Sequence, residues 1–99
     1  MKRPASFTKE AAESLAIQAL SFIASDADRL GTFLAVSGIG PEQIRAAAGE
    51  PGFLAGVLDH VVADETLLLA FTKEAGFAPA DVMRARSALG SVDWEREVP

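Results

Sequence analysis

Ser37-Gly38-Ile39-Gly40-Pro41-Glu42-Gln43-Ile44 is the stretch on which the fold of this chain depends. These eight residues predict the end of one helix, a tight corner and the start of the next helix. Gly38 can adopt the left-handed backbone conformation that commonly closes a helix. Pro41 suits the first position of a new helix, where its missing N–H group is not needed. The stretch therefore predicts two short helices joined by a tight corner.

The same helix stop and start signals recur 38 residues further along the chain, at Ala75-Gly76-Phe77-Ala78-Pro79-Ala80-Asp81-Val82. When residues 19–49 are aligned with residues 57–87, seven of 31 positions are identical: Leu20/Leu58, Asp26/Asp64, Leu30/Leu68, Phe33/Phe71, Gly38/Gly76, Pro41/Pro79 and Ala47/Ala85. The pattern indicates an internal repeat of two three-helix units. Ordinary helix starts and stops that recur in any chain of short helices would also explain it.

The length and composition indicate one helical domain spanning residues 1–99. A chain of 99 residues is long enough to bury a single core without disulfide bonds. It contains no cysteine, which excludes disulfides and thiolate metal sites. The hydrophobic share is 49%, and much of it is alanine, the strongest helix former.

The charge and the apolar runs limit the partners that we expect. Nine Lys and Arg residues against 14 Asp and Glu residues give a net charge of −5, which makes nucleic acid an improbable partner. The run Leu67-Leu68-Leu69-Ala70-Phe71 is too short to span a bilayer. Lys2 and Arg3 are followed by Pro4 and polar residues rather than by a signal-peptide core. We expect an acidic, cytoplasmic protein without a membrane segment.

The apolar periodicity predicts an all-α fold, a compact array of about six short helices. The helices are expected at about 8–24, 26–37, 41–48, 51–63, 65–75 and 79–89. Thr8, Ser25 and Asp64 are the expected N-caps. Residues 1–7 and 91–99 are expected to be loose termini.

Two phenylalanines are the expected core anchors. Phe33 and Phe71 each precede their corner glycine by five residues, on the apolar side of a predicted helix. The structural corners are Gly38 with Pro41 and Gly76 with Pro79. The periodicity also places Val36 and Met83 on inward faces.

The corner Gly38-Ile39-Gly40-Pro41 also resembles the helix-hairpin-helix signature of DNA-binding proteins. In that signature, backbone N–H groups of the turn bind a phosphate. However, the residue after the proline is the acidic Glu42, and Arg45 is the only cation of the predicted helix 41–48. A helix corner with ordinary stop and start residues explains the same sequence.

His60 is the only histidine of the chain. Asp64 follows four residues later, so both side chains could share a helix face. Two ligands do not make a zinc site, which needs three or four. Helix capping accounts for Asp26 and Asp64 at predicted helix starts. We therefore assign no catalytic, cofactor-binding or metal-ligating residue.

Two long phrases resemble a known family. They are ESLAIQALSFIASDADRLGTFLAVSGIGPEQIR and FLAGVLDHVVADETLLLAFTKEAGFAPADVMRAR, which together extend over about residues 11–89. They are similar to the bacterial domain-of-unknown-function family 3572, whose members are small all-helical proteins. The resemblance implies a helical domain and transfers no functional residue.

Three functions remain open from the sequence. The first is a non-catalytic helical protein-interaction or scaffold domain, with another protein or itself as partner. In this interpretation an uncovered apolar face on helix 51–63 or 65–75 supports a homodimer. The second is a nucleic-acid-binding accessory that uses the corner 37–45. The third, with the least support, is an enzyme that uses His60.

Overall fold

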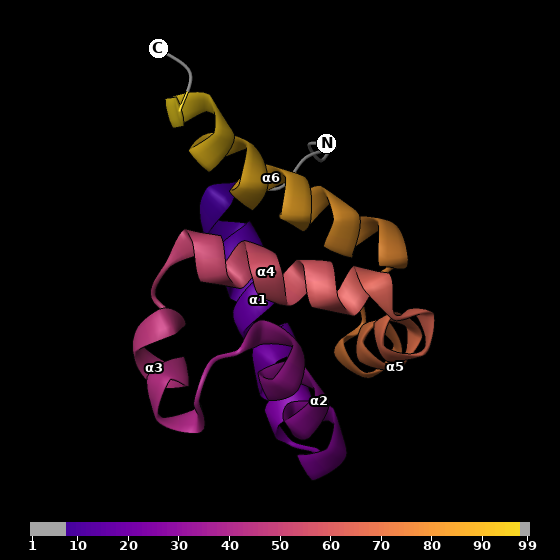
Figure 1. The fold of residues 1–99 in the computed structure, drawn as a ribbon. Coiled ribbons are helices and arrows are strands. Elements are labelled where there is room, and N and C mark those ends of the chain that lie inside the picture. Colours follow the sequence, from indigo (N-terminus) through magenta and orange to yellow (C-terminus); the bar gives the residue numbers. More distant parts are fainter. Residues whose placement is uncertain (1–7, 98–99) are drawn as a thin grey trace.

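The computed structural model describes the backbone of residues 8–97 and the side chains of this range except those of 51 and 90–97. Within 8–97 it contains six α-helices, one short 3-10 helix and no strand, which confirms the all-α prediction (Figure 1). The elements are α1 (Lys9–Ala24), α2 (Ala27–Ser37), η1 (Pro41–Gln43), α3 (Ile44–Ala47), α4 (Pro51–Ala63), α5 (Glu65–Ala75) and α6 (Pro79–Glu97). The termini 1–7 and 98–99, predicted to be loose, lie outside the described residues.

Three helices form the centre of the molecule. α4 and α6 lie side by side, and α1 crosses behind them and packs against both (Figure 1). α2 packs on α1, and α5 packs on α4. The short α3 lies at the edge of the molecule, apart from the central helices (Figure 1).

The core is built mainly from the central helices. Three alanines of α1, at positions 12, 16 and 19, are fully buried. Because their side chains are small, α4 and α6 can pack close to the backbone of α1. Both expected core anchors are buried, since Phe33 is 2% exposed and Phe71 is 1% exposed. Other buried side chains include Leu15, Leu20, Ile23, Leu54, Val57, Leu58, Val61, Val82, Ala85 and Leu89.

Two N-caps form as predicted. The Thr8 hydroxyl accepts the backbone N–H of Ala11 at 3.0 Å and starts α1. The Asp64 carboxylate accepts the backbone N–H of Leu67 at 3.3 Å and starts α5. Each cap satisfies one of the free N–H groups of a helix start.

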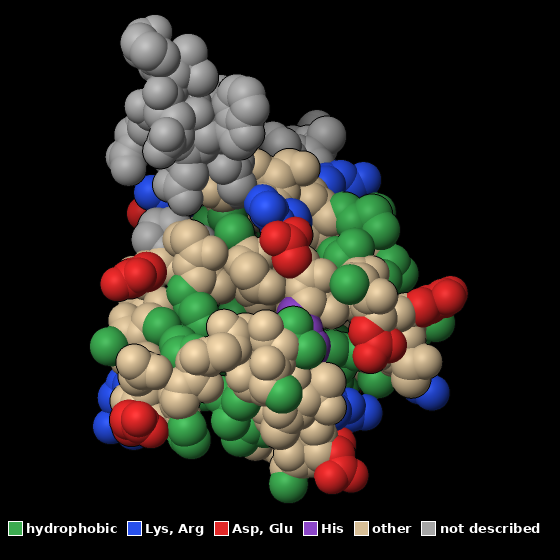
Figure 2. All heavy atoms as spheres, in the orientation of Figure 1, with side chains coloured by type: hydrophobic (Ala, Val, Ile, Leu, Met, Phe, Trp, Pro, Cys, Tyr) green, Lys and Arg blue, Asp and Glu red, His purple; other side chains and the backbone are tan. Residues whose placement is uncertain are grey.

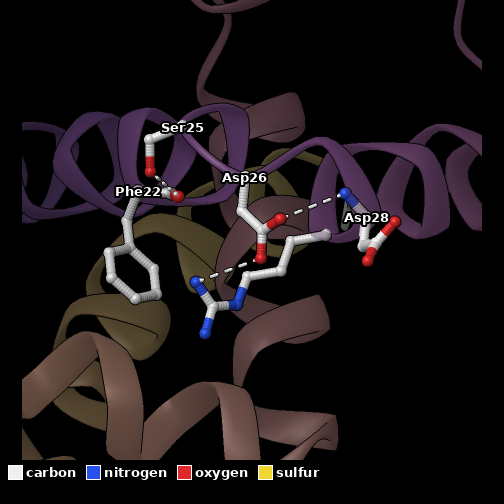
Figure 3. A network of polar contacts seen from close by, with 5 residues as sticks. Phe22, Ser25, Asp26 and Asp28 are labelled. Carbon is white, nitrogen blue, oxygen red and sulfur yellow. Dashed lines mark hydrogen bonds and ion pairs between the residues drawn. The ribbon is translucent and has the colours of Figure 1, made fainter.

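The predicted cap of α2 was wrong by one residue. Asp26 has the extended backbone of a cap, with φ −125° and ψ 119°, and its carboxylate accepts the N–H of Asp28 at 3.2 Å. Ser25 keeps helical angles, and its hydroxyl donates to the carbonyl of Phe22 at 2.7 Å (Figure 3). Ser25 therefore ends α1 instead of starting α2, and the chain turns at Asp26.

Both corner glycines adopt the left-handed conformation that the sequence predicts. Gly38 has φ +75° and Gly76 has φ +83°, the only positive φ values among the described residues. Their N–H groups donate to the carbonyls of Leu34 and Thr72, each at 2.9 Å. A side chain at either position would be strained, because a Cβ atom crowds the left-handed backbone.

The helix starts that follow these corners also correspond at the offset of 38. The N–H of Gly40 donates to the Gln43 side chain at 2.8 Å. The N–H of Ala78 donates to the Asp81 side chain at 2.9 Å. The residue two positions after the corner glycine is thus held in the same way in both halves.

The aromatic contacts are reciprocal between the halves. The Phe33 ring lies 5.1 Å from the His60 ring, and the Phe71 ring lies 5.7 Å from the Phe22 ring, measured between centroids. The offset of 38 relates Phe33 to Phe71 and Phe22 to His60. Each half therefore contributes the same two positions to the ring contacts between the halves.

The third helices of the two halves differ from the prediction and from each other. The expected helix 41–48 is a 3-10 turn followed by one α-helical turn, and it ends at Ala47. The expected helix 79–89 continues through Gly90 to Glu97, which also corrects the loose tail predicted for 91–97. Gly90 costs a helix only about 1 kcal/mol relative to alanine, and no proline follows until Pro99.

Two residues expected in the interior are exposed. Val36 on α2 is 70% exposed, and Met83 on α6 is 49% exposed. Helical periodicity predicts an apolar face but does not show whether another helix covers it. Val36 belongs to a groove described below.

Candidate functional site

An apolar groove with a volume of about 460 Å³ lies between α2 and α4. Figure 2 shows the side of the molecule on which α2 and α4 lie, where hydrophobic side chains reach the surface between scattered charges. The groove is lined by Phe33, Val36 and Ser37 from α2 and by Gly52, Phe53, Gly56, Asp59, His60 and Ala63 from α4. Its volume is within the range of protein binding sites.

Aromatic rings form one wall of the groove. The buried Phe33 ring meets the Phe53 ring edge to face at 5.9 Å and the His60 ring edge to face at 5.1 Å. Such pairs stabilise each other beyond the area that they bury. The three rings therefore support one another along this wall.

Two glycines, Gly52 and Gly56, open the first turns of α4 along the groove. Gly52, Gly56, His60 and Ala63 follow one another at spacings of three or four residues and therefore share a helix face. No atom lies within 4 Å of the position that a Cβ would take at Gly56. The backbone of α4 is thus accessible to a group that enters the groove.

The other half of the chain carries polar residues at the corresponding places. At the offset of 38, the groove positions Val36, Gly52, Gly56 and Ala63 correspond to Glu74, Ser14, Gln18 and Ser25, all of which are exposed. The opposite exchange occurs at Ser37 and His60, whose counterparts are Ala75 and Phe22. The counterparts of four groove positions that are apolar or glycine therefore carry polar side chains.

A smaller cavity of about 170 Å³ lies on the other side of His60. It is lined by Asp28, Arg29, Thr32, His60, Asp64, Thr66 and Leu67. His60 and Asp64 thus line one cavity, as their spacing suggested, yet the described residues contain no group of three His, Asp or Glu side chains that could hold a metal ion. Within those residues, the imidazole contacts the Phe33 ring and has no hydrogen-bond partner that would orient it as a base.

The arginines of the described helices are largely paired. Arg86 on α6 binds both carboxylate oxygens of Asp59 on α4, the second at 3.1 Å. Arg84 binds Asp81 at 3.0 Å within α6. Sequence reasoning missed the Arg86–Asp59 pair because its partners are 27 residues apart.

Arg29 is held at the corner between α1 and α2. Its guanidinium lies 3.5 Å from the Asp26 carboxylate and 4.7 Å from the centroid of the Phe22 ring, which places it over the aromatic face. The Asp26 carboxylate also accepts the backbone N–H of Asp28 in the first turn of α2, as a dashed line in Figure 3 marks. The ion pair and the cation–π contact together fix Arg29 at this corner.

The amides of the corner 38–40 already have partners. The Gly40 N–H binds Gln43, the Gly38 N–H binds Leu34, and the Ile39 N–H meets the Ser37 hydroxyl at 3.4 Å. A carboxylate oxygen of Glu42 lies 2.9 Å from the position of a Cβ at Gly40. The amides that would bind a phosphate are used within the chain, with an acidic group beside them. The geometry favours the interpretation of this motif as a structural corner.

One sequence signal could have revealed the groove. Gly52 and Gly56 lie one turn apart in a predicted helix, where each glycine costs stability without serving a cap or a corner. Both glycines and their counterparts Ser14 and Gln18 lie outside the two similar ranges, 19–49 and 57–87. Their position facing α2 was not readable from the chain.

Comparisons with known proteins identify the family but no better-known relative. Neither the curated proteins nor the solved structures give a significant match. Among the described residues, no helix is long and apolar enough to cross a membrane. A family model matches residues 9–91, and the chain therefore belongs to the family described as protein of unknown function DUF3572.

Proposed function

We propose that this protein is a non-catalytic helical interaction domain that binds a protein through the groove between α2 and α4. One observation carries the proposal. Four groove positions are apolar or glycine, whereas the corresponding positions of the other half are polar and exposed. Since the fold tolerates polar residues there, folding does not require the apolar character, and a binding role explains it.

The exposed Val36 supports this proposal. It is 70% exposed at the edge of the groove, although full burial of a valine side chain is worth about 1.5 kcal/mol or more. The counterpart of Val36 is Glu74, which suits a solvated surface. A partner that covers Val36 would bury this side chain and so gain binding free energy.

The two other functions of the sequence analysis have less support. The corner 37–45 has internal partners for its amides and Glu42 beside them, which disfavours phosphate binding. His60 has an aromatic neighbour and no orienting partner among the described residues, which disfavours general base catalysis. A second copy of the chain remains a candidate partner beside other proteins.

Photocrosslinking in the native host tests the proposal. A photoreactive phenylalanine analogue is introduced at Val36, and its adducts are identified by mass spectrometry. The matched control places the same analogue at Glu74, the counterpart outside the groove. We expect a defined protein adduct at 36 that Gly56→Gln removes and that is absent at 74. The same adducts at both positions, or none at 36, would contradict the proposal.

A further inference from the structure

We infer that the occupant of the α2–α4 groove is a basic amphipathic helix of a partner protein, lying along α4 across Gly52 and Gly56. This inference rests on the proposed function and names the partner's chemistry. Three features of the groove lead to it: its length, its open backbone and its charge.

The dimensions of the groove fit a helix of about three turns. Its α4 residues run from Gly52 to Ala63, which corresponds to about 16 Å along the helix axis at 1.5 Å per residue. Gly52 and Gly56 leave two successive turns of α4 without a side chain on this face, before His60. A second helix can therefore approach its backbone closely and place its own side chains in the gap.

The walls of the groove select an apolar face on that helix. Phe33 and Phe53 form the aromatic wall, and Val36 lies exposed about one turn along α2 from Phe33. Leucine-like anchors at spacings of three and four residues would contact both sides of the groove. This is the usual way in which an amphipathic helix binds a hydrophobic groove.

The charges around the groove favour a basic helix. Among the described residues, Asp59 is the only charged side chain that lines the groove, and Arg86 already binds both of its carboxylate oxygens. Asp28 and Asp64 line the adjoining cavity beyond His60, where Arg29 is already paired with Asp26. The Asp28 and Asp64 carboxylates form no ion pair with the described residues, and the chain has a net charge of −5, so lysine and arginine residues that flank the apolar face are favoured.

The same charge argument disfavours a second copy of the chain. Each copy carries a net charge of −5, so two copies repel each other at low ionic strength. Among the described residues, the exposed large apolar side chains are Ile17, Val36, Leu69 and Met83, which lie on four different helices. The groove is therefore better suited to a foreign basic helix.

Binding of synthetic helices tests the inference directly. The first probe is a fluorescein-labelled 18-residue peptide with leucines at helical i, i+3, i+4 and i+7 positions and lysines elsewhere. The second replaces every lysine with glutamate, and the third scrambles the order of the first. Fluorescence anisotropy with the full chain should show that the lysine helix binds at least about 10-fold more tightly than either control.

Two variants of the chain locate the binding. Gly56→Gln fills the groove with the residue found at its counterpart Gln18, and Val36→Glu copies Glu74. Each should weaken the lysine helix at least about 10-fold, whereas the control Gln18→Ala should change affinity less than about 2-fold. Val36→Glu is decisive, because an added acidic group would strengthen purely electrostatic binding of a lysine peptide. Circular dichroism confirms that each variant is folded.

The possible outcomes separate this inference from the proposed function. Equal binding of the lysine and glutamate helices, binding unaffected by Gly56→Gln, or no helix binding by the folded chain would each overturn the inference. If crosslinks at Val36 still depended on Gly56, the groove would remain an interaction site with a different occupant. A Val36 crosslink to a second copy of the chain would likewise overturn the basic helix and retain the interaction function.

Discussion

At the scale of single residues, the glycines of this chain serve two different purposes. Gly38 and Gly76 have positive φ and close helices, where any side chain is strained. Gly31 and Gly56 lie inside helices, and no atom is within 4 Å of the position of an added Cβ. The first pair is therefore needed for the fold, whereas the second pair lowers helix stability.

Alanine substitutions should separate these two kinds of glycine. Gly38→Ala and Gly76→Ala should each lower the free energy of unfolding by about 1–2 kcal/mol, because the left-handed backbone disfavours a Cβ. Gly31→Ala should raise it by up to about 1 kcal/mol, since it improves helix propensity without a clash. Urea unfolding followed by circular dichroism measures all three. Neutral substitutions at both corners would contradict the role of the corners.

The two core phenylalanines should differ in their contribution to stability. Phe71 is enclosed by the rings of Phe22 and Phe77, with centroids at 5.7 and 6.1 Å, so Phe71→Ala should cost about 3–5 kcal/mol. Phe33 lines the open groove, and Phe33→Ala should cost at least about 1 kcal/mol less, because water can enter the enlarged groove. Equal losses in urea unfolding would show that both rings are equally enclosed.

At the scale of the helices, the Asp59–Arg86 pair joins α4 to α6. The side chain of Arg86 is 33% exposed and that of Asp59 is 59% exposed, so solvent screens the pair. Arg86→Met should lower stability by no more than about 1 kcal/mol, and 1 M NaCl should remove most of the difference.

Arg84→Met is the matched control for this pair. Arg84 binds Asp81 within α6 and connects no second helix. Its loss should cost only a few tenths of a kcal/mol, as for other exposed pairs on one helix. A larger loss for Arg84→Met than for Arg86→Met in thermal unfolding would contradict the connecting role of the α4–α6 pair.

The third helices show how similar corners lead to different packing. α6 buries Val82 and Ala85 completely against the central helices, whereas the corresponding Ile44 and Ala47 are half-buried. The 3-10 start and early end of the first unit's helix leave it at the periphery. The two third helices are therefore packed unequally, although the corners before them are alike.

At the scale of the whole molecule, we predict no binding to duplex DNA at physiological salt. The net charge is −5, the amides of the corner 38–40 have internal partners, and Arg29, Arg84 and Arg86 are paired with carboxylates. The acidic net charge opposes the counterion release from phosphates that drives such binding. Anisotropy titration with a labelled random duplex measures this. A dissociation constant below about 1 µM would contradict it, because it is tighter than typical non-specific binding.

The sequence by itself determined where most helices begin and end. The Thr8 and Asp64 caps, the left-handed glycines and the N1 prolines depend on contacts within about four residues, so short-range rules identify them. These rules failed where two signals competed, as at Ser25, or where a glycine lacked a left-handed corner, as at Gly90.

Only the tertiary structure decided which surfaces remain open. The exposure of Val36, the Asp59–Arg86 pair and the groove all depend on how α2, α4 and α6 pack, which joins residues far apart in the chain. Helical periodicity identifies an apolar face but not whether another helix covers it. Burial is a property of the packed helices, and for this reason the sequence revealed the corners of the fold but not its groove.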